Sequence, residues 1–263
     1  MHNLKVTLVQ TELHWENADA NLDMFTQKLS EIEKGSTHLI VLPEMFTTGF
    51  SMNAKTLAEK EKGKIMQWMA LQANNKNAVI TGSIIFEEDE KYYNRLIWMR
   101  PDGTFEYYNK RHLFSMGNEH LHYTAGTKKL ITQLNGWKIC PLVCYDLRFP
   151  VWSRNHFIKE NETAIGEYDL LLYIANWPER RNHPWKTLLL ARAIENQCYV
   201  AGLNRAGADG NDIIHSGDSA VINAKGEIIS TIPAHKNYIS TIELNYNELI
   251  NFRKEFPVGL DAD

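Results

Sequence analysis

Short apolar segments alternate with segments of helical periodicity along most of this 263-residue chain. Residues 170–175 read Leu-Leu-Leu-Tyr-Ile-Ala, a run typical of a strand that is buried on both faces. Residues 17–34 instead place Leu22, Phe25 and Leu29 at helical spacing. Because strands and helices alternate in this way, the sequence predicts an α/β core.

The alternation of predicted strands and helices continues through both halves of the chain. Strands are predicted at residues 4–10, 38–42, 78–86, 92–100, 104–108, 137–143, 168–176, 199–204, 219–223, 227–232 and 238–244, and helices at 17–34, 65–72, 150–160, 183–197 and 246–253. Turn signals such as Pro101-Asp102-Gly103 join neighbouring strands, so mixed sheets are expected. No linker-like stretch interrupts the pattern. Residues 1–263 are therefore predicted to form one domain, with the tail at 255–263 extended or at a subunit interface.

Composition narrows the classes of function. Hydrophobic residues make up 44% of the chain and charged residues 23%, which is typical of a globular protein. A formal net charge of −4 disfavours nucleic-acid binding, which needs many phosphate contacts. No apolar run is long enough to span a membrane, and the N-terminus lacks a secretory pattern. Three cysteines are too few for a disulfide framework, so a reducing compartment, the cytoplasm, is expected.

Three residues suited to catalysis follow apolar strands. Glu44 comes directly after Val41-Leu42-Pro43, Lys110 after the hairpin strand at 104–108, and Cys144 after the strand at 137–143. Binding sites in open α/β sheets are commonly built at such strand ends. Taken singly, each residue also has an interpretation without catalysis. Glu44 could be a strand-end acid bonded to a loop, Lys110 a solvated surface lysine and Cys144 a buried structural cysteine.

Together the three offer nucleophilic chemistry. Cys144 sits where a strand gives way to a turn and a helix, a placement that exposes a nucleophile and leaves the following N–H groups free to hold an oxyanion. A thiol needs a base or a cation to react at neutral pH, roles open to Glu44 and Lys110.

Metal, redox and nucleotide chemistry have weaker support. Cys140 and Cys144 do not form a C-x-x-C pair, and His112, His120 and His122 lack a recognisable ligand frame. No phosphate-binding glycine motif occurs. We expect neither a metal nor a cofactor.

Three segments, Leu42-Pro43-Glu44-Met45-Phe46, Tyr108-Asn109-Lys110-Arg111-His112-Leu113 and Leu142-Val143-Cys144-Tyr145-Asp146-Leu147-Arg148-Phe149-Pro150, resemble the signature segments of the nitrilase superfamily of carbon–nitrogen hydrolases. The resemblance covers nearly the whole chain and extends to Ala175-Asn176-Trp177-Pro178 and Ser216-Gly217-Asp218-Ser219. It implies a four-layer αββα sandwich with mixed sheets.

The resemblance also implies roles for individual residues. Glu44 matches the general base, Lys110 the oxyanion lysine and Cys144 the nucleophile of a Glu-Lys-Cys triad. Glu119, ahead of Tyr123-Thr124-Ala125-Gly126, matches a second glutamate, although Ala125 stands where many members have proline. The family commonly forms homodimers, and the segment after Cys144 is a candidate contact face.

Tyr145-Asp146-Leu147-Arg148 and Asn176-Trp177-Pro178 are most similar to the bacterial omega-amidase branch, which hydrolyses the terminal amide of small dicarboxylic monoamides such as 2-oxoglutaramate and 2-oxosuccinamate. A substrate carboxylate calls for a cation. The candidates are Arg148, Arg180, Arg181 and Arg205, with Arg148 also able to pair with Asp146 or Glu195. Tyr145, Trp177 and Phe114 are expected to line the pocket.

Several alternatives stay open at this point. The triad does not separate an omega-amidase from another amidase, an N-carbamoyl hydrolase or a nitrilase. Outside this chemistry, the chain could be a catalytically silent binding protein, or a thiol-redox or metal protein.

Overall fold

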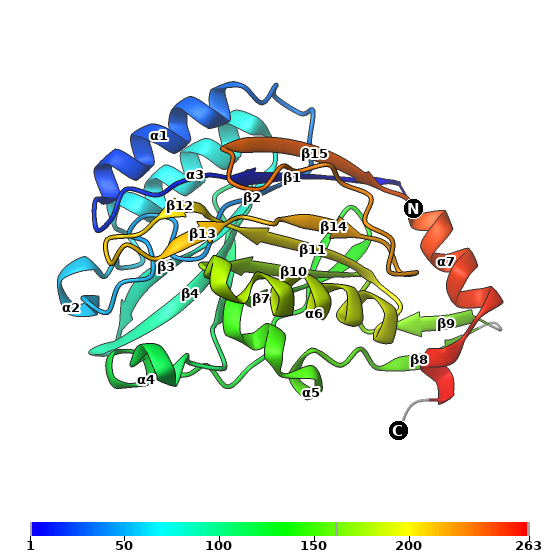
Figure 1. Cartoon of the computed structure of the whole chain (residues 1–263). Helices are drawn as coiled ribbons and strands as arrows, with labels where there is room; N and C mark the ends of the chain where they lie inside the picture. The colour runs from blue at the N-terminus through cyan, green and yellow to red at the C-terminus, as the bar shows by residue number, and fades with distance from the viewer. Residues whose placement is uncertain (1, 161–162, 262–263) are drawn as a thin grey trace.

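The computed structural model describes residues 2–160 and 163–261 and contains two large sheets and two hairpins (Figure 1). The six-stranded sheet has the order β15-β1-β2-β3-β4-β5, and the five-stranded sheet has the order β14-β11-β10-β7-β6. Strand pairs β1/β2, β2/β3, β7/β10 and β10/β11 are parallel, and the outer strands pair antiparallel. The predicted mixed sheets are confirmed.

The elements follow one another with short connections. The strands of the large sheets are β1 Leu4–Gln10, β2 Leu39–Val41, β3 Val79–Glu88, β4 Lys91–Met99, β5 Phe105–Asn109, β6 Thr132–Leu134, β7 Trp137–Val143, β10 Leu170–Ala175, β11 Tyr199–Asn204, β14 Ala220–Ile222 and β15 Tyr238–Leu244. The hairpins are β8 Phe157–Glu160 with β9 Thr163–Gly166, and β12 Ala206–Ala208 with β13 Ile214–Ser216. The α-helices are α1 Ala18–Ser30, α2 Ala54–Leu57, α3 Lys64–Lys76, α4 Glu119–His122, α5 Pro150–Ser153, α6 Asn182–Glu195 and α7 Tyr246–Glu255. Single 3₁₀ turns lie at η1 Ser115–Gly117, η2 Cys144–Arg148, η3 Glu179–Arg181 and η4 Val258–Asp261.

Alternating side chains of the six-stranded sheet supply two apolar layers. On β2, Leu39 and Val41 join a core shared with the five-stranded sheet, whereas Ile40 joins a core shared with α1 and α3. Successive side chains of a strand point to opposite faces, so one strand can serve both layers. The helices α1 and α3 therefore cover one face of this sheet, and the second sheet covers the other.

The helix α6 covers the outer face of the five-stranded sheet. Gly202 on β11 allows this close approach, because a Cβ atom there would lie 2.5 Å from Leu189 and 3.1 Å from Trp185. All six side chains of β10 are buried, as a strand between two apolar layers requires. The result is the predicted αββα arrangement, with the carboxyl ends of the parallel strands opening at one edge.

The helix predicted over residues 150–160 is wrong beyond its first turn. Only α5 is helical, and β8 pairs antiparallel with β9 instead. Asn155 causes the change, because its backbone N–H and side-chain amide hydrogen-bond to Asn196, and its side chain also exchanges hydrogen bonds with the backbone of Tyr168. These long-range bonds direct the backbone away from a helix, and sequence periodicity does not record them.

Other element limits differ from the prediction as well. The helix predicted to Lys34 ends at Ser30, and Asn17 caps its N-terminus by accepting the Ala20 N–H. Residues 227–232 follow a turn at 224–225 and make a single bridge, from Ile228 to Ile222 of β14, rather than a full strand. The Ser230 hydroxyl accepts the Val221 N–H in place of a backbone carbonyl, which shortens the ladder.

Near the C-terminus, residues up to 261 fold back onto the domain. Gln197 accepts the Gly259 N–H and donates to the Phe256 carbonyl. Residues 262 and 263 of the predicted tail lie outside the described residues. In the part of the chain that the structure describes, no helix has both the length and the apolar character needed to cross a bilayer.

Candidate active site

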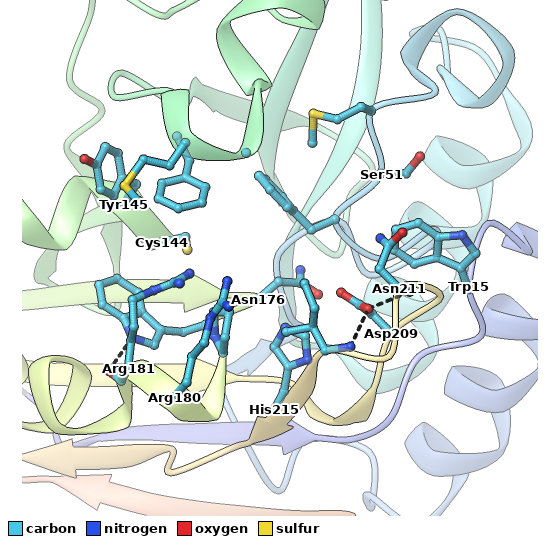
Figure 2. A pocket seen from close by; sticks show the side chains of 18 of the residues that line it. Trp15, Ser51, Cys144, Tyr145, Asn176, Arg180, Arg181, Asp209, Asn211 and His215 are labelled. Atoms are coloured by element: carbon cyan, nitrogen blue, oxygen red, sulfur yellow. Dashed lines mark hydrogen bonds between the residues drawn. The ribbon is translucent and has the colours of Figure 1, made fainter.

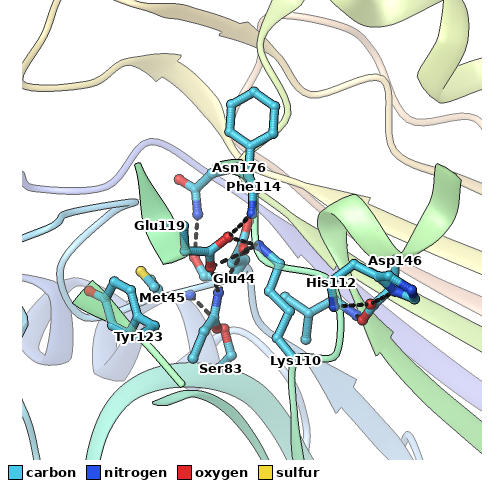
Figure 3. A network of polar contacts seen from close by, with 12 residues as sticks. Glu44, Met45, Ser83, Lys110, His112, Phe114, Glu119, Tyr123, Asp146 and Asn176 are labelled. Carbon is cyan, nitrogen blue, oxygen red and sulfur yellow. Dashed lines mark hydrogen bonds and ion pairs between the residues drawn. The ribbon is translucent and has the colours of Figure 1, made fainter. Parts of the chain in front are cut away.

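The carboxyl ends of β2, β5, β7 and β10 bring the predicted residues together. Glu44 follows β2, where Leu42 still pairs with β3 and Met45 donates its N–H to the Ser83 hydroxyl at 2.8 Å. Lys110 follows β5, and its N–H donates to the Asn94 carbonyl. These sheet bonds fix both backbones, so the two side chains enter the same buried volume (Figure 3).

Lys110 lies between two carboxylates. Its Nζ is 2.9 Å from Glu44 Oε1 and 2.9 Å from Glu119 Oε2, and all three side chains are fully buried. Burial acts to lower the pKa of Lys110, but the negative charges of Glu119 and Glu44 outweigh it and raise that pKa above its ordinary value. Lys110 therefore carries a proton at neutral pH and holds the two carboxylates at fixed positions.

Glu119 is anchored by more than Lys110. Its Oε2 accepts the Phe114 N–H at 2.6 Å, and its Oε1 accepts from Asn94 at 3.2 Å. Burial raises the pKa of Glu119, and Lys110 opposes that shift. The side chain is thus held between the Lys110 ammonium and the backbone at Phe114, where η1 begins.

Glu44 has donors on both carboxylate oxygens. Besides Lys110, Oε1 accepts from Asn94 at 2.8 Å, and Oε2 accepts the Asn176 N–H at 2.7 Å. Asn176 also donates its side-chain Nδ2 to the Glu44 carbonyl at 2.5 Å. The end of β10 thereby fastens the carboxylate to the opposite sheet.

Cys144 takes a strained position beside this cluster. Its φ of 45° is rare for a residue other than glycine, and it turns the chain from β7 into η2. Burial raises the pKa of the Cys144 thiol well above its usual range, the charge of Glu44 and a hydrogen bond with it raise that pKa further, and Lys110 opposes them. The raised pKa favours the protonated thiol over the thiolate beside Glu44.

The turn after Cys144 is held by Asp146. This buried carboxylate accepts from the Tyr108 hydroxyl at 2.7 Å, from the Val143 N–H at 3.1 Å, and from both the backbone and the ring of His112 at 2.9 and 2.7 Å. Because Tyr108 and His112 flank Lys110, Asp146 ties the loop of Cys144 to the loop of Lys110.

Cys144 opens into a cavity of about 430 Å³ (Figure 2). Its lining includes the predicted Tyr145, Arg148, Trp177 and Phe114, together with Asn176. The cluster of Glu44, Lys110 and Glu119 is buried, and the cavity beside Cys144 has aromatic side chains in its lining. The far end of the cavity is lined by residues outside the sequence prediction, namely Trp15, Glu16, Ser51, Asn53, Asp209, Asn211, Ile213 and His215.

Three of the four candidate arginines line this cavity. Arg148 lies 5.0 Å from the centre of the Trp177 ring, and Arg181 lies 5.2 Å from that of Phe114. Burial and the charge of the adjacent Arg180 lower the pKa of Arg181. The lining holds three arginines against two acidic residues, Glu16 and Asp209, and this excess of positive charge favours a ligand that carries a carboxylate.

Arg205 does not line the cavity, and the two acidic residues considered as partners of Arg148 are bonded to other groups. Arg205 is buried behind the cavity wall, where it donates to the carbonyls of Ala206 and Ala208. The bonds given above occupy Asp146, and Glu195 pairs with Arg192 at 2.9 Å. Arg148 is therefore placed as a cavity residue.

A comparison with known families identifies the chain. The pattern of the family "Carbon-nitrogen hydrolase" matches residues 5–254.

The chain belongs to the carbon–nitrogen hydrolase family.

Relatives and solved structures narrow this assignment. This carbon–nitrogen hydrolase is 48% identical to omega-amidase YafV of Escherichia coli K12, covering 100% of this chain and 98% of that protein. It is 34% identical to 2-oxoglutaramate amidase of Bacillus subtilis over 86% of each chain. The crystal structure of XC1258 from Xanthomonas campestris, a CN-hydrolase superfamily protein with an arsenic adduct in its active site, superimposes with a TM-score of 0.96 at 44% identity, covering 100% of this chain and 98% of that one. The chain lies in the omega-amidase branch of the nitrilase superfamily, and its fold is confirmed.

Sequence reasoning missed the site role of Asn94. It lies in the middle of β4, where an asparagine has no local signal, and only the packing of α4 against the sheet brings Glu119 to it. Asn176 was noted as part of a motif, but its contacts with Glu44 depend on the meeting of two sheets. Among the described residues, no group of three or more His, Cys, Asp or Glu side chains is arranged to hold a metal ion.

Proposed function

We propose that this enzyme hydrolyses the terminal amide of small dicarboxylic monoamides, with 2-oxoglutaramate and 2-oxosuccinamate as the substrate class, to a dicarboxylate and ammonia. The observation that carries the proposal is the juxtaposition of two features: a buried Glu44–Lys110–Glu119 cluster against Cys144, and a cavity whose open side carries Arg148 and Arg181. The names of the relatives support the same substrate class.

In the first half of the reaction, Glu44 accepts the proton of the Cys144 thiol as Sγ attacks the amide carbon. This coupling is needed because the raised pKa of the thiol leaves little free thiolate at neutral pH. The carbonyl oxygen becomes an oxyanion, which Lys110 and the Tyr145 N–H stabilise. Glu44 then returns the proton to the nitrogen, the C–N bond breaks and ammonia leaves.

In the second half, water attacks the resulting thioester. Glu44 takes a proton from the water, the C–S bond breaks, and Cys144 leaves as a thiol after regaining a proton. Glu119 has its oxygens bonded to Lys110, Asn94 and Phe114, which favours a role in fixing Lys110 over a role as the second base. The balance is one amide and one water for one carboxylate and one ammonia.

Arg148 is our candidate for the group that binds the substrate carboxylate, with Arg180 and Arg181 beside it. It follows Cys144 by one turn, so it projects from the loop that carries the nucleophile. Tyr145, Trp177 and Phe114 form the apolar wall that orients the carbon chain between the two ends.

We further propose a homodimer in the cytoplasm, with the amide substrate as its partner and no binding of nucleic acid or membrane. Val151 on α5 is 88% exposed, which supports α5 as a contact face. Phe157, expected on the same helix, lies on β8 instead. A monomeric mass by light scattering at micromolar concentration would contradict the dimer.

A panel of amide and nitrile substrates tests the proposed function. Ammonia release is measured with 2-oxoglutaramate, 2-oxosuccinamate, glutamine, an aliphatic nitrile and an N-carbamoyl amino acid. We expect the two oxo-amides to have the largest kcat/KM. A preference for the nitrile or the carbamoyl compound would keep the cysteine chemistry and overturn the substrate class, and no turnover of any compound would favour a silent binding protein.

A further inference from the structure

Asn176 carries a polar atom that the mechanism above does not use. Its side-chain oxygen, Oδ1, is buried and has no hydrogen-bond partner among the described residues. The residue is only 5% exposed, yet it lines the cavity that Cys144 opens into. A buried carbonyl oxygen without a donor is costly, so such an atom in a substrate cavity indicates a group on the ligand.

The orientation of the Asn176 amide is fixed by its surroundings. The neighbouring Glu44 backbone carbonyl can only accept, and the Asn176 atom 2.5 Å from it must therefore be the donor Nδ2. The oxygen then occupies the opposite side of the amide and points away from Glu44, as Figure 3 shows. The Asn176 backbone N–H also binds Glu44, so the backbone and the side-chain amide of Asn176 are both held against that residue.

The Asn176 oxygen is a hydrogen-bond acceptor, whereas the positively charged groups near Cys144 are donors. Lys110 and the arginines of the cavity can only donate, so they suit the carbonyl oxygen and the carboxylate of the substrate. An amide –NH₂ group needs the reverse, an acceptor. Glu44 acts as a donor when it returns its proton to the nitrogen. The N–H groups that the nitrogen already carries therefore need a second oxygen atom that can accept their hydrogen bonds.

We propose that Asn176 Oδ1 accepts an N–H of the substrate's –NH₂ group and holds the departing nitrogen against Glu44. This inference rests on the proposed function and deepens it by assigning the residue that selects primary amides. Nitriles and esters have no N–H at the leaving position, so the same atom disfavours them. Asn176 is thereby a specificity-determining residue for the leaving group.

The test compares two substrates that form the same thioester. These are 2-oxoglutaramate and the 5-methyl ester of 2-oxoglutarate, which differ only in the leaving group. The quantity measured is kcat/KM, which reports the steps up to loss of ammonia or methanol. In Asn176→Ala, we expect kcat/KM for the amide to fall about ten- to a hundredfold more than that for the ester.

Asn94→Ala is the matched control. It also removes an asparagine that donates to Glu44, but Asn94 does not line the cavity. We expect it to slow both substrates by the same factor. An equal loss on amide and ester in Asn176→Ala as well would show that Asn176 only positions Glu44 and would overturn the inference.

Asn176→Asp covers the case in which the alanine variant does not fold. Aspartate keeps an oxygen at the Oδ1 position but loses the donor to the Glu44 carbonyl, so both rates should fall while their ratio stays near that of the wild type. A ratio that falls tenfold in this variant would also contradict the inference. Failure of the proposed function is distinguishable, because it would show in the wild type as absent turnover of the amide.

Discussion

The catalytic cluster and the mouth of the cavity are held in different ways. Glu44, Lys110 and Glu119 are fully buried, and each makes at least two charged or polar contacts of about 3 Å. At the mouth, Arg148 and Arg181 rest against aromatic faces and remain partly exposed. The difference indicates that the fold fixes the three proposed catalytic side chains, whereas the arginines proposed to bind the substrate can adjust.

Removal of the nucleophile should have the largest effect. We expect Cys144→Ala to lower kcat for 2-oxoglutaramate by about 10⁴-fold or more, because no thioester can form. Cys140→Ala is the matched control, since Cys140 is buried in β7 away from the cavity. The control should lose stability and keep its activity, as thermal unfolding and ammonia release would show. Residual activity within tenfold of the wild type in Cys144→Ala would contradict the covalent route.

Loss of the central cation should affect stability as well as rate. In Lys110→Met, two carboxylates remain buried without their countercharge, which we expect to lower the free energy of unfolding by about 3–5 kcal/mol. Urea unfolding measures this change. Lys60→Met removes a lysine that is 70% exposed and 3.3 Å from Glu87, and it should change stability little. Similar small changes in both variants would refute the idea that Lys110 holds the cluster together.

The pH dependence of cysteine alkylation tests the difference in solvent access between Cys144 and the two buried cysteines. Burial and Glu44 raise the pKa of Cys144, so the thiolate is populated only as pH rises. Iodoacetamide labelling of Cys144, followed by peptide mass spectrometry, should therefore accelerate by about tenfold per pH unit from pH 7 to 9. Cys140 and Cys198 are closed to the reagent and should label only after unfolding. A plateau near pH 7, or equal labelling of all three cysteines, would be the opposite result.

At the mouth, a smaller and more selective effect is expected. Arg148→Met should raise KM for 2-oxoglutaramate by about ten- to a hundredfold and leave a neutral amide such as butyramide unchanged, because only the first has a carboxylate to bind. Arg205→Met serves as the comparison, since Arg205 is buried behind the cavity wall and its loss should lower the melting temperature. Equal KM changes on both amides would remove Arg148 from carboxylate binding.

The sequence predicts some elements of this fold well and others wrongly. The limits of β1, β7, β11 and β15 agree with the predicted strands, because the apolar patterns there are strong. Glu44, Lys110 and Cys144 follow strands and belong to family motifs, so their positions could be predicted, while their catalytic roles stay predictions. The helix predicted at 150–160 fails because Asn155 hydrogen-bonds to residues distant in sequence.

The choice among the arginines lay beyond the sequence for a related reason. Arg148, Arg180, Arg181 and Arg205 are all near motif residues, and local pattern does not distinguish a cation on the cavity wall from one behind it. Likewise, Asn94 looks like an ordinary strand residue until β4 is placed beside β5. In each case the deciding contacts join elements that are far apart along the chain.

Glu44→Gln tests the central claim most directly, namely that a buried carboxylate moves the proton of a neutral thiol. The measurement is kcat for 2-oxoglutaramate, with thermal unfolding to confirm that the variant folds. Because glutamine cannot accept the thiol proton, the account predicts a loss of about 10²–10⁴-fold with Cys144 intact. A folded Glu44→Gln enzyme with kcat within a few fold of the wild type would contradict it.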